Sequence, residues 1–262
     1  MFYHTYIADN EELYRRNIFT FMHKYVNDRQ AINTNQQEPI KITIGVSGGS
    51  MAKLICLPLK TITYTFPKVE FIIFPVDERL VPTAHSDNNM HNYIKEFSDG
   101  FNGRIIVMSS EFIDDAKSTA ESFTEILRNL KPPIHECFPV FDFLFLGIGP
   151  DGHTCSLFPG HNLLKEDKLW VAAIEDSPKP PPRRITITLP VINAAKIVAF
   201  IITGESKAQI VKEIIRDRNM KYPPSMIQRS EVHFFLDPPA ASQLKPEDFD
   251  FVLGNIRRKI HQ

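Results

Sequence analysis

Short apolar segments of strand length alternate along this chain with longer stretches whose apolar residues recur at helical spacing. This alternation is typical of α/β proteins, because neighbouring parallel strands need a crossover connection that is usually a helix. The expected strands are 42–46, 71–76, 105–108, 141–146, 170–174, 184–189, 197–203 and 232–236. We therefore predict a Rossmann-like α/β fold, a mostly parallel sheet flanked by helices.

Helical spacing and turn residues divide the rest of the chain. The expected helices are 10–27, 114–130, 206–216 and 246–258, and another follows the turn at 47–50. Ser206 is expected to cap its helix. Residues 33–38 are expected to form a polar surface loop. No repeat, low-complexity linker or break in composition occurs, so residues 1–262 are predicted to form a single domain.

The charge balance excludes several partners. Thirty Lys and Arg residues against 31 Asp and Glu give a net charge of −1, so no basic field is expected to hold nucleic acid or an anionic membrane. The apolar runs are far shorter than the roughly 20 residues of a membrane span. Asp9, Glu11 and Glu12 stand where a secretory signal needs a basic end and an apolar run. Three widely spaced cysteines form no C-x-x-C pair and fit a reducing compartment, so we expect a cytoplasmic protein.

A turn of small residues, Ser47, Gly48, Gly49 and Ser50, lies between an expected strand and an expected helix. Such a turn lets backbone N–H groups converge on an anion at the helix N-terminus, and the serine hydroxyls add donors. The four residues are a candidate phosphate site, although an ordinary strand-to-helix turn has the same pattern. Neither a Walker loop nor a dinucleotide fingerprint is present.

The segment 143–160 carries the strongest chemical signal. An apolar strand runs into a glycine-rich turn, Gly-Ile-Gly-Pro-Asp-Gly-His, which presents Asp151 and His153 two residues apart. Histidine is the side chain best matched to acid and base work near neutral pH, and the glycines allow a substrate to approach closely. We therefore predict that His153 is catalytic.

Further charged residues occur where expected strands begin or end. An Asp-Glu-Arg run places Asp77 and Arg79 either at the sheet edge where α/β proteins bind ligands or at the solvated start of a loop. Prolines precede Arg183 and Arg184 at the start of another strand. A guanidinium in this position either binds an anion or belongs to a basic turn on the surface. Lys207 falls in the first turn of an expected helix, a position where a bound anion offsets the unfavourable helix dipole.

The residue types limit the reaction class. No G-x-S-x-G nucleophile motif occurs, and no His, Asp and Glu residues have metal-ligand spacing. The residues alone therefore point to an acid–base enzyme, without a metal or cofactor, that acts on a small phosphorylated molecule.

In this order, the segments resemble the 6-phosphogluconolactonase family, part of a larger group that includes the glucosamine-6-phosphate deaminases. The matching motifs are S-G-G-S at 47–50, V-D-E-R-L-V-P at 76–82, S-D-N-N at 86–89, L-G-I-G-P-D-G-H-T-C-S-L-F-P-G-H at 146–161, S-P-K-P-P-P-R-R-I-T-I-T at 177–188 and G-E-S-K-A at 204–208. Cys155 stands where the family usually has Ala. The resemblance implies hydrolysis of 6-phosphoglucono-1,5-lactone to 6-phosphogluconate, the second step of the oxidative pentose phosphate pathway.

The resemblance also assigns roles near the reacting bond. His153 is implied as the base that activates water for attack on the lactone carbonyl, and Asp151 helps to orient the site. Asp77 and Arg79 are implied to lie near the sugar. The sequence leaves open whether Arg79 or a backbone N–H stabilises the oxyanion.

The phosphate group has its own implied contacts. The family pattern gives this role to the loop at 47–50, to Lys207 and to Arg184. Arg183 is adjacent to Arg184, and register with the family favours Arg184. The implied partner is a small sugar-phosphate lactone, and we expect a monomer or a weak oligomer.

Two other functions are compatible with parts of this sequence. Glucosamine-6-phosphate deaminases share much of this pattern but place a catalytic Glu five residues after the histidine, where this chain has Phe158. A non-catalytic sugar-phosphate sensor would need an attached DNA-binding element, and the first 40 residues hold one expected helix without a basic face. Both functions fit the sequence less well than a lactonase.

Overall fold

The computed structural model describes residues 2–32, 39–108, 114–248 and 251–252. Within them, an eight-stranded sheet has the order β13-β1-β12-β11-β8-β2-β3-β5, and all neighbouring strands are parallel. Its strands are β1 Phe2–Ile7, β2 Ile40–Val46, β3 Val69–Pro75, β5 Arg104–Ile105, β8 Phe143–Leu146, β11 Ile197–Ile202, β12 Glu231–Leu236 and β13 Phe251–Val252. The predicted α/β fold with a mostly parallel sheet is confirmed.

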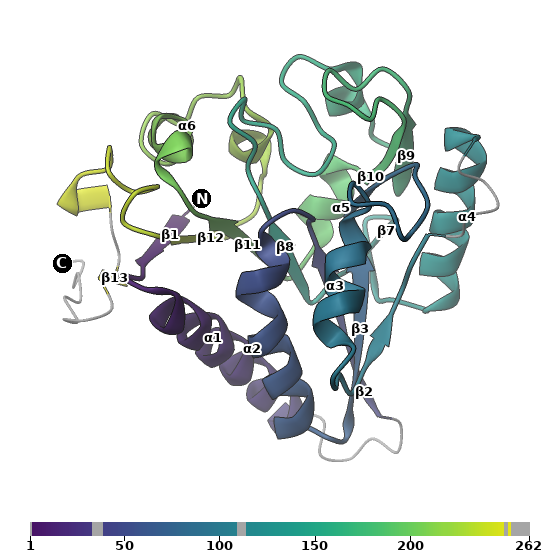
Figure 1. Ribbon diagram of the computed structural model, residues 1–262, viewed down its shortest axis with the longest axis horizontal. Helices are drawn as coiled ribbons and strands as arrows, with labels where there is room; N and C mark the ends of the chain where they lie inside the picture. The colour runs from purple at the N-terminus through teal and green to yellow at the C-terminus, as the bar shows by residue number, and fades with distance from the viewer. Residues whose placement is uncertain (1, 33–38, 109–113, 249–250, 253–262) are drawn as a thin grey trace.

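Helices cover both faces of this sheet (Figure 1). Successive side chains of a strand point to opposite faces, so Phe143 and Phe145 enter one buried cluster while Leu144 and Leu146 enter another. The first cluster includes residues of α1 (Glu11–Ile32), α2 (Met51–Thr65) and α3 (Asn89–Phe97). The second includes residues of α4 (Ala116–Asn129), α5 (Leu189–Ala194) and α6 (Ala208–Ile215). A strand buried on both faces explains the almost continuous apolar runs in the sequence.

The order of the strands creates a crevice between β2 and β8. The chain moves outward from β2 to β3 and β5, and then returns to place β8 on the other side of β2. The loops that leave β2 and β8 at their carboxyl ends therefore diverge. Open α/β sheets bind ligands at such a switch point.

A smaller antiparallel sheet lies beside this crevice. It consists of β4 (Asp77–Arg79), β10 (Arg184–Ile187) and β9 (Val171–Ile174), in the order β4-β10-β9. The remaining described elements are the pair β6 Ile134–His135 and β7 Phe138–Pro139 and the 3-10 helices η2 Asn162–Lys165, η3 Glu205–Lys207, η4 Pro223–Met226 and η5 Pro246–Asp248. No helix in the described ranges is long and apolar enough to cross a membrane.

The structure corrects the predicted closing helix at 246–258. Among the described residues of this range, Pro246–Asp248 form a short 3-10 turn, and Phe251–Val252 pair with β1 as an edge strand. The first strand exposes unpaired backbone groups at the edge of the sheet, and a returning segment satisfies some of them. The rest of the predicted helix, and the predicted loop at 33–38, lie outside the described residues.

Several other boundaries differ from the prediction. The expected strand at 105–108 is only the two-residue β5, and the opening helix continues beyond residue 27 to Ile32. Ser206 does not cap α6: it lies in η3, and the helix starts at Ala208 after Lys207. The strand β1 and the helices α3 and α5 were not predicted, because short amphipathic segments carry a weak periodic signal.

Candidate active site

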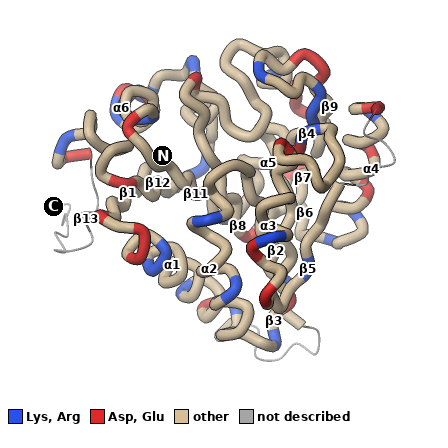
Figure 2. Tube along the Cα trace, in the orientation of Figure 1, with Lys and Arg blue, Asp and Glu red and all other residues tan. Residues whose placement is uncertain are grey.

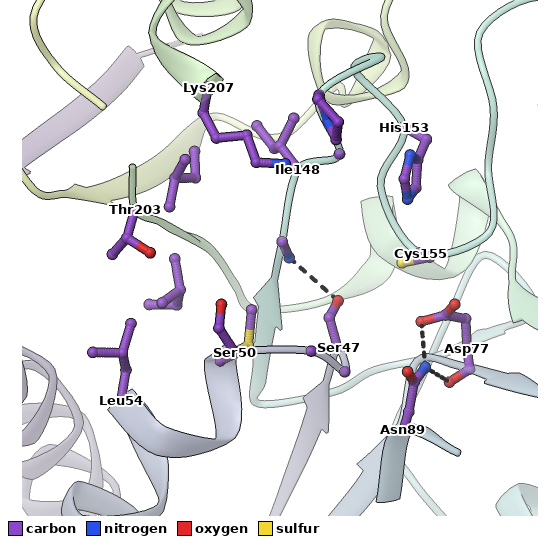
Figure 3. Close-up of a pocket in the computed structure, with 18 of the residues that line it drawn as sticks. Ser47, Ser50, Leu54, Asp77, Asn89, Ile148, His153, Cys155, Thr203 and Lys207 are labelled. Atoms are coloured by element: carbon purple, nitrogen blue, oxygen red, sulfur yellow. Dashed lines mark hydrogen bonds between the residues drawn. The ribbon is translucent and has the colours of Figure 1, made fainter. Parts of the chain in front are cut away.

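A cavity of about 270 Å³ opens at the carboxyl ends of β2, β8 and β11 (Figure 3). Loops 47–50 and 147–150 line it, together with Thr203 and Lys207 from the segment after β11. Asp77, Arg79, Asn89, His153 and Cys155 also line it. Seen in Figure 3, Lys207 and Ser50 lie on one side and His153 and Asp77 on the other. The topological switch point thus brings together most of the residues singled out from the sequence.

The His153 side chain is held by a carboxylate. Its Nδ1 lies 2.5 Å from Asp151 Oδ1, and Lys179 Nζ lies 2.9 Å from the same oxygen. The ring of Phe158 packs against the imidazole, with ring centroids 4.7 Å apart. An ionised Asp151 assigns the imidazole proton to Nδ1, which leaves Nε2 as the proton acceptor.

The electrostatics of this pair suit a general base. Partial burial acts to raise the pKa of Asp151, but hydrogen bonds from Lys179 and His153 outweigh it and lower this pKa to about 2. Burial lowers the pKa of His153 below its usual value, and this effect exceeds the opposing effect of Asp151. At neutral pH the carboxylate is therefore ionised and the imidazole is neutral, the state in which histidine accepts a proton.

Side chains approach the backbone so closely at two positions near the cavity that only glycine fits there. A Cβ at Gly149 would lie 2.1 Å from the His153 ring, so no larger residue leaves room for the imidazole in this position. A Cβ at Gly48 would lie 1.8 Å from Asn89 Oδ1. The two glycine turns therefore allow the backbone of the loops after β2 and β8 to approach the side chains around the cavity.

The loop at 47–50 is anchored from two directions. Ser47 Oγ accepts the Gly147 N–H at 3.3 Å, and the Tyr93 hydroxyl donates to the Ser47 carbonyl at 2.7 Å. Ser50 occupies the capping position of α2, but its side chain makes no capping hydrogen bond. A fixed turn at a helix N-terminus with an uncommitted hydroxyl is suited to an anion.

Lys207 approaches the same cavity from the segment after β11. Burial, and then the neighbouring Lys179, lower its pKa below the usual value for lysine. Both effects disfavour its charged form, and an anion in the cavity would oppose them. The cavity therefore has one basic side and one side where His153 is held.

Asp77 lies in the edge strand β4 and is only 5% exposed, so the alternative of a solvated loop is wrong for this residue. Its carboxylate accepts hydrogen bonds from Ser156 Oγ at 2.8 Å and from Asn89 Nδ2 at 3.2 Å. Arg79, two residues on, donates to the Asp87 carbonyl at 2.9 Å. Both residues line the cavity, and their contact with the sugar stays a prediction.

Asp151 and Arg184 lie behind the cavity wall and do not line it. Arg184 is 2% exposed, and its guanidinium donates to the carbonyl groups of 179–181 and to Ser156 Oγ. Arg183 is directed elsewhere: it donates to the Asp114 carbonyl and forms an exposed ion pair with that residue. Arg184 is thus the arginine nearer the site, and its contact with phosphate stays a prediction.

Sequence reasoning missed two residues at the site. Asn89 lines the cavity, and its Oδ1 is buried without a hydrogen-bond partner among the described residues. It belongs to the S-D-N-N motif, which was noted for the resemblance but not as a source of ligands. Lys179 lies within the proline-rich motif at 177–188, but its partner Asp151 is remote in sequence and no periodic pattern connects the two residues.

The described residues contain no group of three or more His, Cys, Asp or Glu side chains that is placed to hold a metal ion. Cys155 is buried, and burial followed by the negative charge of Asp77 raises its pKa well above the usual value. Its thiol is therefore protonated at neutral pH and is a poor nucleophile.

Sequence and structure comparisons show which known proteins this chain is similar to. The family described as glucosamine-6-phosphate isomerases/6-phosphogluconolactonase matches residues 18–235. Rat 6-phosphogluconolactonase is 39% identical over 212 residues, which cover 78% of this chain and 81% of the rat protein. The human 6-phosphogluconolactonase is 37% identical over 213 residues, with 78% and 81% covered. The solved structure of 6-phosphogluconolactonase from Trypanosoma cruzi superposes with a TM-score of 0.76 at 24% identity, covering 92% of this chain and 97% of that one.

The fold and the site thus define an α/β protein of the sugar-phosphate isomerase and lactonase class. The chain belongs to the family of glucosamine-6-phosphate isomerases and 6-phosphogluconolactonases. Within that family, the rat and human relatives that it matches over most of their length are 6-phosphogluconolactonases.

Proposed function

We propose that this chain hydrolyses 6-phospho-D-glucono-1,5-lactone to 6-phosphogluconate in the oxidative pentose phosphate pathway. The observation that carries the proposal is that His153, held by Asp151, lines the same cavity as the anion-suited loop 47–50 and Lys207. A sugar-phosphate lactone needs both features: a base for the ester bond and a basic pocket for the phosphate.

In the proposed reaction, His153 Nε2 takes a proton from water as the water oxygen attacks the lactone carbonyl. Asp151 keeps the other proton on Nδ1 and stabilises the imidazolium that forms. The tetrahedral oxyanion then collapses, the bond to the ring oxygen breaks, and His153 returns its proton to that oxygen. The product is an open-chain hydroxy acid, and the imidazole is neutral again.

The opposite side of the cavity is proposed to hold the phosphate. The N–H groups at the start of α2, the hydroxyls of Ser47 and Ser50 and the ammonium of Lys207 supply donors. Arg79 and Asn89 also line the cavity and are suited to the sugar and the oxyanion. Arg184 is proposed to act on the phosphate side while it also fixes the loop at 179–181.

Phe158 favours this reaction over deamination. It is 2% exposed and packs on the His153 ring, at the position where the resemblance places a glutamate in the deaminases. An apolar side chain cannot take part in a proton relay with the imidazole. The carboxylate that bonds to His153 is Asp151 instead.

The decisive experiment measures hydrolysis of freshly prepared lactone by the wild type and by His153→Gln. Release of 6-phosphogluconate is coupled to its dehydrogenase, and spontaneous opening is subtracted. We expect activity in the wild type and a loss of at least about 100-fold in the variant. Wild-type protein without activity above background would reject the proposal, and the next tests would be deamination of glucosamine 6-phosphate and binding of sugar phosphates without turnover.

We also propose that the protein acts in the cytoplasm as a monomer or a weak oligomer. Cys56, Cys137 and Cys155 are all free thiols, which fits a reducing compartment. Cell fractionation and light scattering of the purified protein test the two statements separately.

A further inference from the structure

A second cavity, of about 690 Å³, lies between α1 and the sheet near β1 and β12. It is larger than the candidate active-site cavity, and the described residues that line the two are different. This volume falls within the range of about 300–1,000 Å³ that is usual for small-molecule sites. The reaction proposed above makes no use of it.

Aromatic rings form one wall of this second cavity. Tyr6 stacks on Phe235 with ring centroids 4.7 Å apart, and Phe21 of α1 meets His233 at 4.7 Å. Burial, and then the neighbouring His4, lower the pKa of His233 to about 4, so its ring is neutral at physiological pH. The Tyr6 ring lies at 14° to Phe235 and at 22° to His233, whereas Phe21 is tilted by 59° to His233. Neutral rings in stacked and tilted orientations are suited to contact with another planar ring.

Hydrogen-bond donors of α1 line this cavity: Arg16 and Asn17 near one end, and Lys24 two turns further along the helix, one turn before Asp28. Arg16 lines the cavity and is exposed, and its guanidinium makes no hydrogen bond or ion pair within the described part of the chain. Asn17 also lines it and is 8% exposed, and its buried Nδ2 has no acceptor among the described residues. An unpaired buried donor costs free energy, which an acceptor atom beside it recovers.

The carboxylates of the cavity lie away from Arg16. Helix α1 starts just after β1, and the hydroxyl of Tyr14, its fourth residue, donates to the Phe235 carbonyl, so the start of α1 lies near the carboxyl end of β12. Asp28 lies twelve residues after Arg16 on α1, a distance of about 18 Å along the helix axis at 1.5 Å per residue. Glu231 is at the opposite end of β12 and pairs with His4 at 3.9 Å. Figure 2 shows basic and acidic residues along α1, separated by uncharged residues.

We propose that this second cavity binds a small planar aromatic acid, with its ring against Tyr6, Phe21 and His233 and its acidic group beside Arg16 and Asn17. Rings supply the apolar contact area, and the two unpaired donors supply the polar contacts that fix orientation. Such a site is independent of the lactone reaction, and neither proposal depends on the other.

The test uses 2-naphthoate as the probe and 2-naphthalenemethanol as an uncharged analogue with the same rings. Isothermal titration calorimetry of the full chain should give one binding site for 2-naphthoate, with the alcohol roughly tenfold weaker, the loss expected for one charge-assisted hydrogen bond. Arg16→Gln should weaken naphthoate to the level of the alcohol and leave alcohol binding unchanged. Lys53→Gln, an exposed cation on α2 outside the cavity, should change neither.

A second variant tests the position of the ligand. Thr20 lines the cavity and is exposed, so Thr20→Trp should fill the space without disturbing the core and should abolish binding of both probes. The thermal midpoint of each variant checks that it is folded, and saturating 6-phosphogluconate should not displace the probe. The proposal is overturned if naphthoate does not bind at about 1 mM, if folded Thr20→Trp binds it as well as the wild type, or if 6-phosphogluconate displaces it.

Discussion

Glu78 Oε1 lies 2.7 Å from the backbone nitrogen of Asn89, so a fully buried carboxylate joins the edge strand β4 to the first turn of α3. Its two oxygens also accept the N–H groups of Arg79 and Met90. Glu78 therefore holds together the two backbone segments that carry Arg79 and Asn89 into the cavity wall. This role is one of position, because Glu78 does not line the cavity.

The burial of Glu78 predicts a pH-dependent stability. Burial is the largest effect on Glu78 and raises its pKa from 4.5 to about 7, although hydrogen bonds from backbone N–H groups oppose the change. Between these values the folded protein retains a proton that the unfolded chain has released, so the free energy of unfolding falls as the pH rises. The contribution is on the order of 3 kcal/mol. Urea unfolding at pH 5 and pH 7.5 should show a smaller difference for Glu78→Gln than for the wild type, and equal differences would contradict the assignment.

Removing the partner of His153 should impair the chemical step more than binding. In Asp151→Asn the imidazole loses the acceptor that holds its proton on Nδ1, so we expect kcat to fall by at least about 100-fold with a small change in KM. Asp176→Asn is the matched control, because Asp176 pairs with His161 at 3.0 Å on the surface. Steady-state kinetics of both variants measure this effect. Equal kcat values for Asp151→Asn and the wild type would remove Asp151 from the mechanism.

Lys207 should act in binding. We expect Lys207→Met to raise KM for the lactone roughly tenfold while kcat changes little, because a contact to a non-reacting phosphate is kept through the reaction. Lys212→Met is the control, because Lys212 lies five residues further on, in α6, and is paired with Asp217. A lower kcat at constant KM would instead place Lys207 near the reacting bond.

Arg184 should contribute to stability as well as to binding. Arg184→Ala leaves the carbonyl groups of 179–181 without their buried donor and removes a cation from above the Phe158 ring, so the free energy of unfolding should fall by about 2–4 kcal/mol. Arg183→Ala removes an exposed ion pair and should cost less than about 1 kcal/mol. Denaturant titration of both variants compares the two adjacent arginines directly. A similar loss of unfolding free energy in both variants would show that the described contacts of Arg184 contribute little to stability.

Much of the fold was predictable because its signals are local. The apolar run that ends at Leu146 and the glycine turn that follows it need no knowledge of the rest of the chain. The loop at 47–50 and His153 were predicted for the same reason, since each motif combines a strand end with a turn. Their location in one cavity followed from a general property of parallel sheets.

The errors concern contacts that depend on distant residues. The segment that contains β13 reads as a helix, but the unpaired edge of β1 provides strand partners more than 240 residues away in sequence. The ion pair between Asp151 and Lys179, and the difference between the two adjacent arginines, depend on how the proline-rich loop folds back over the site. Nothing in the local pattern of the sequence encodes these distances.

The hydrogen bond from the Gly147 N–H to Ser47 Oγ connects positions 100 residues apart. Each residue directly follows a strand, and the two strands meet only when β8 is inserted beside β2. The chain must therefore close a very long loop before the two turns of the site face each other, which is a slow event in folding. During synthesis, a ribosome-bound chain that has already formed α1 and α2 still has no complete site. In refolding, helical signal should accordingly return before turnover does, and the interval between them reports when the centre of the sheet is joined.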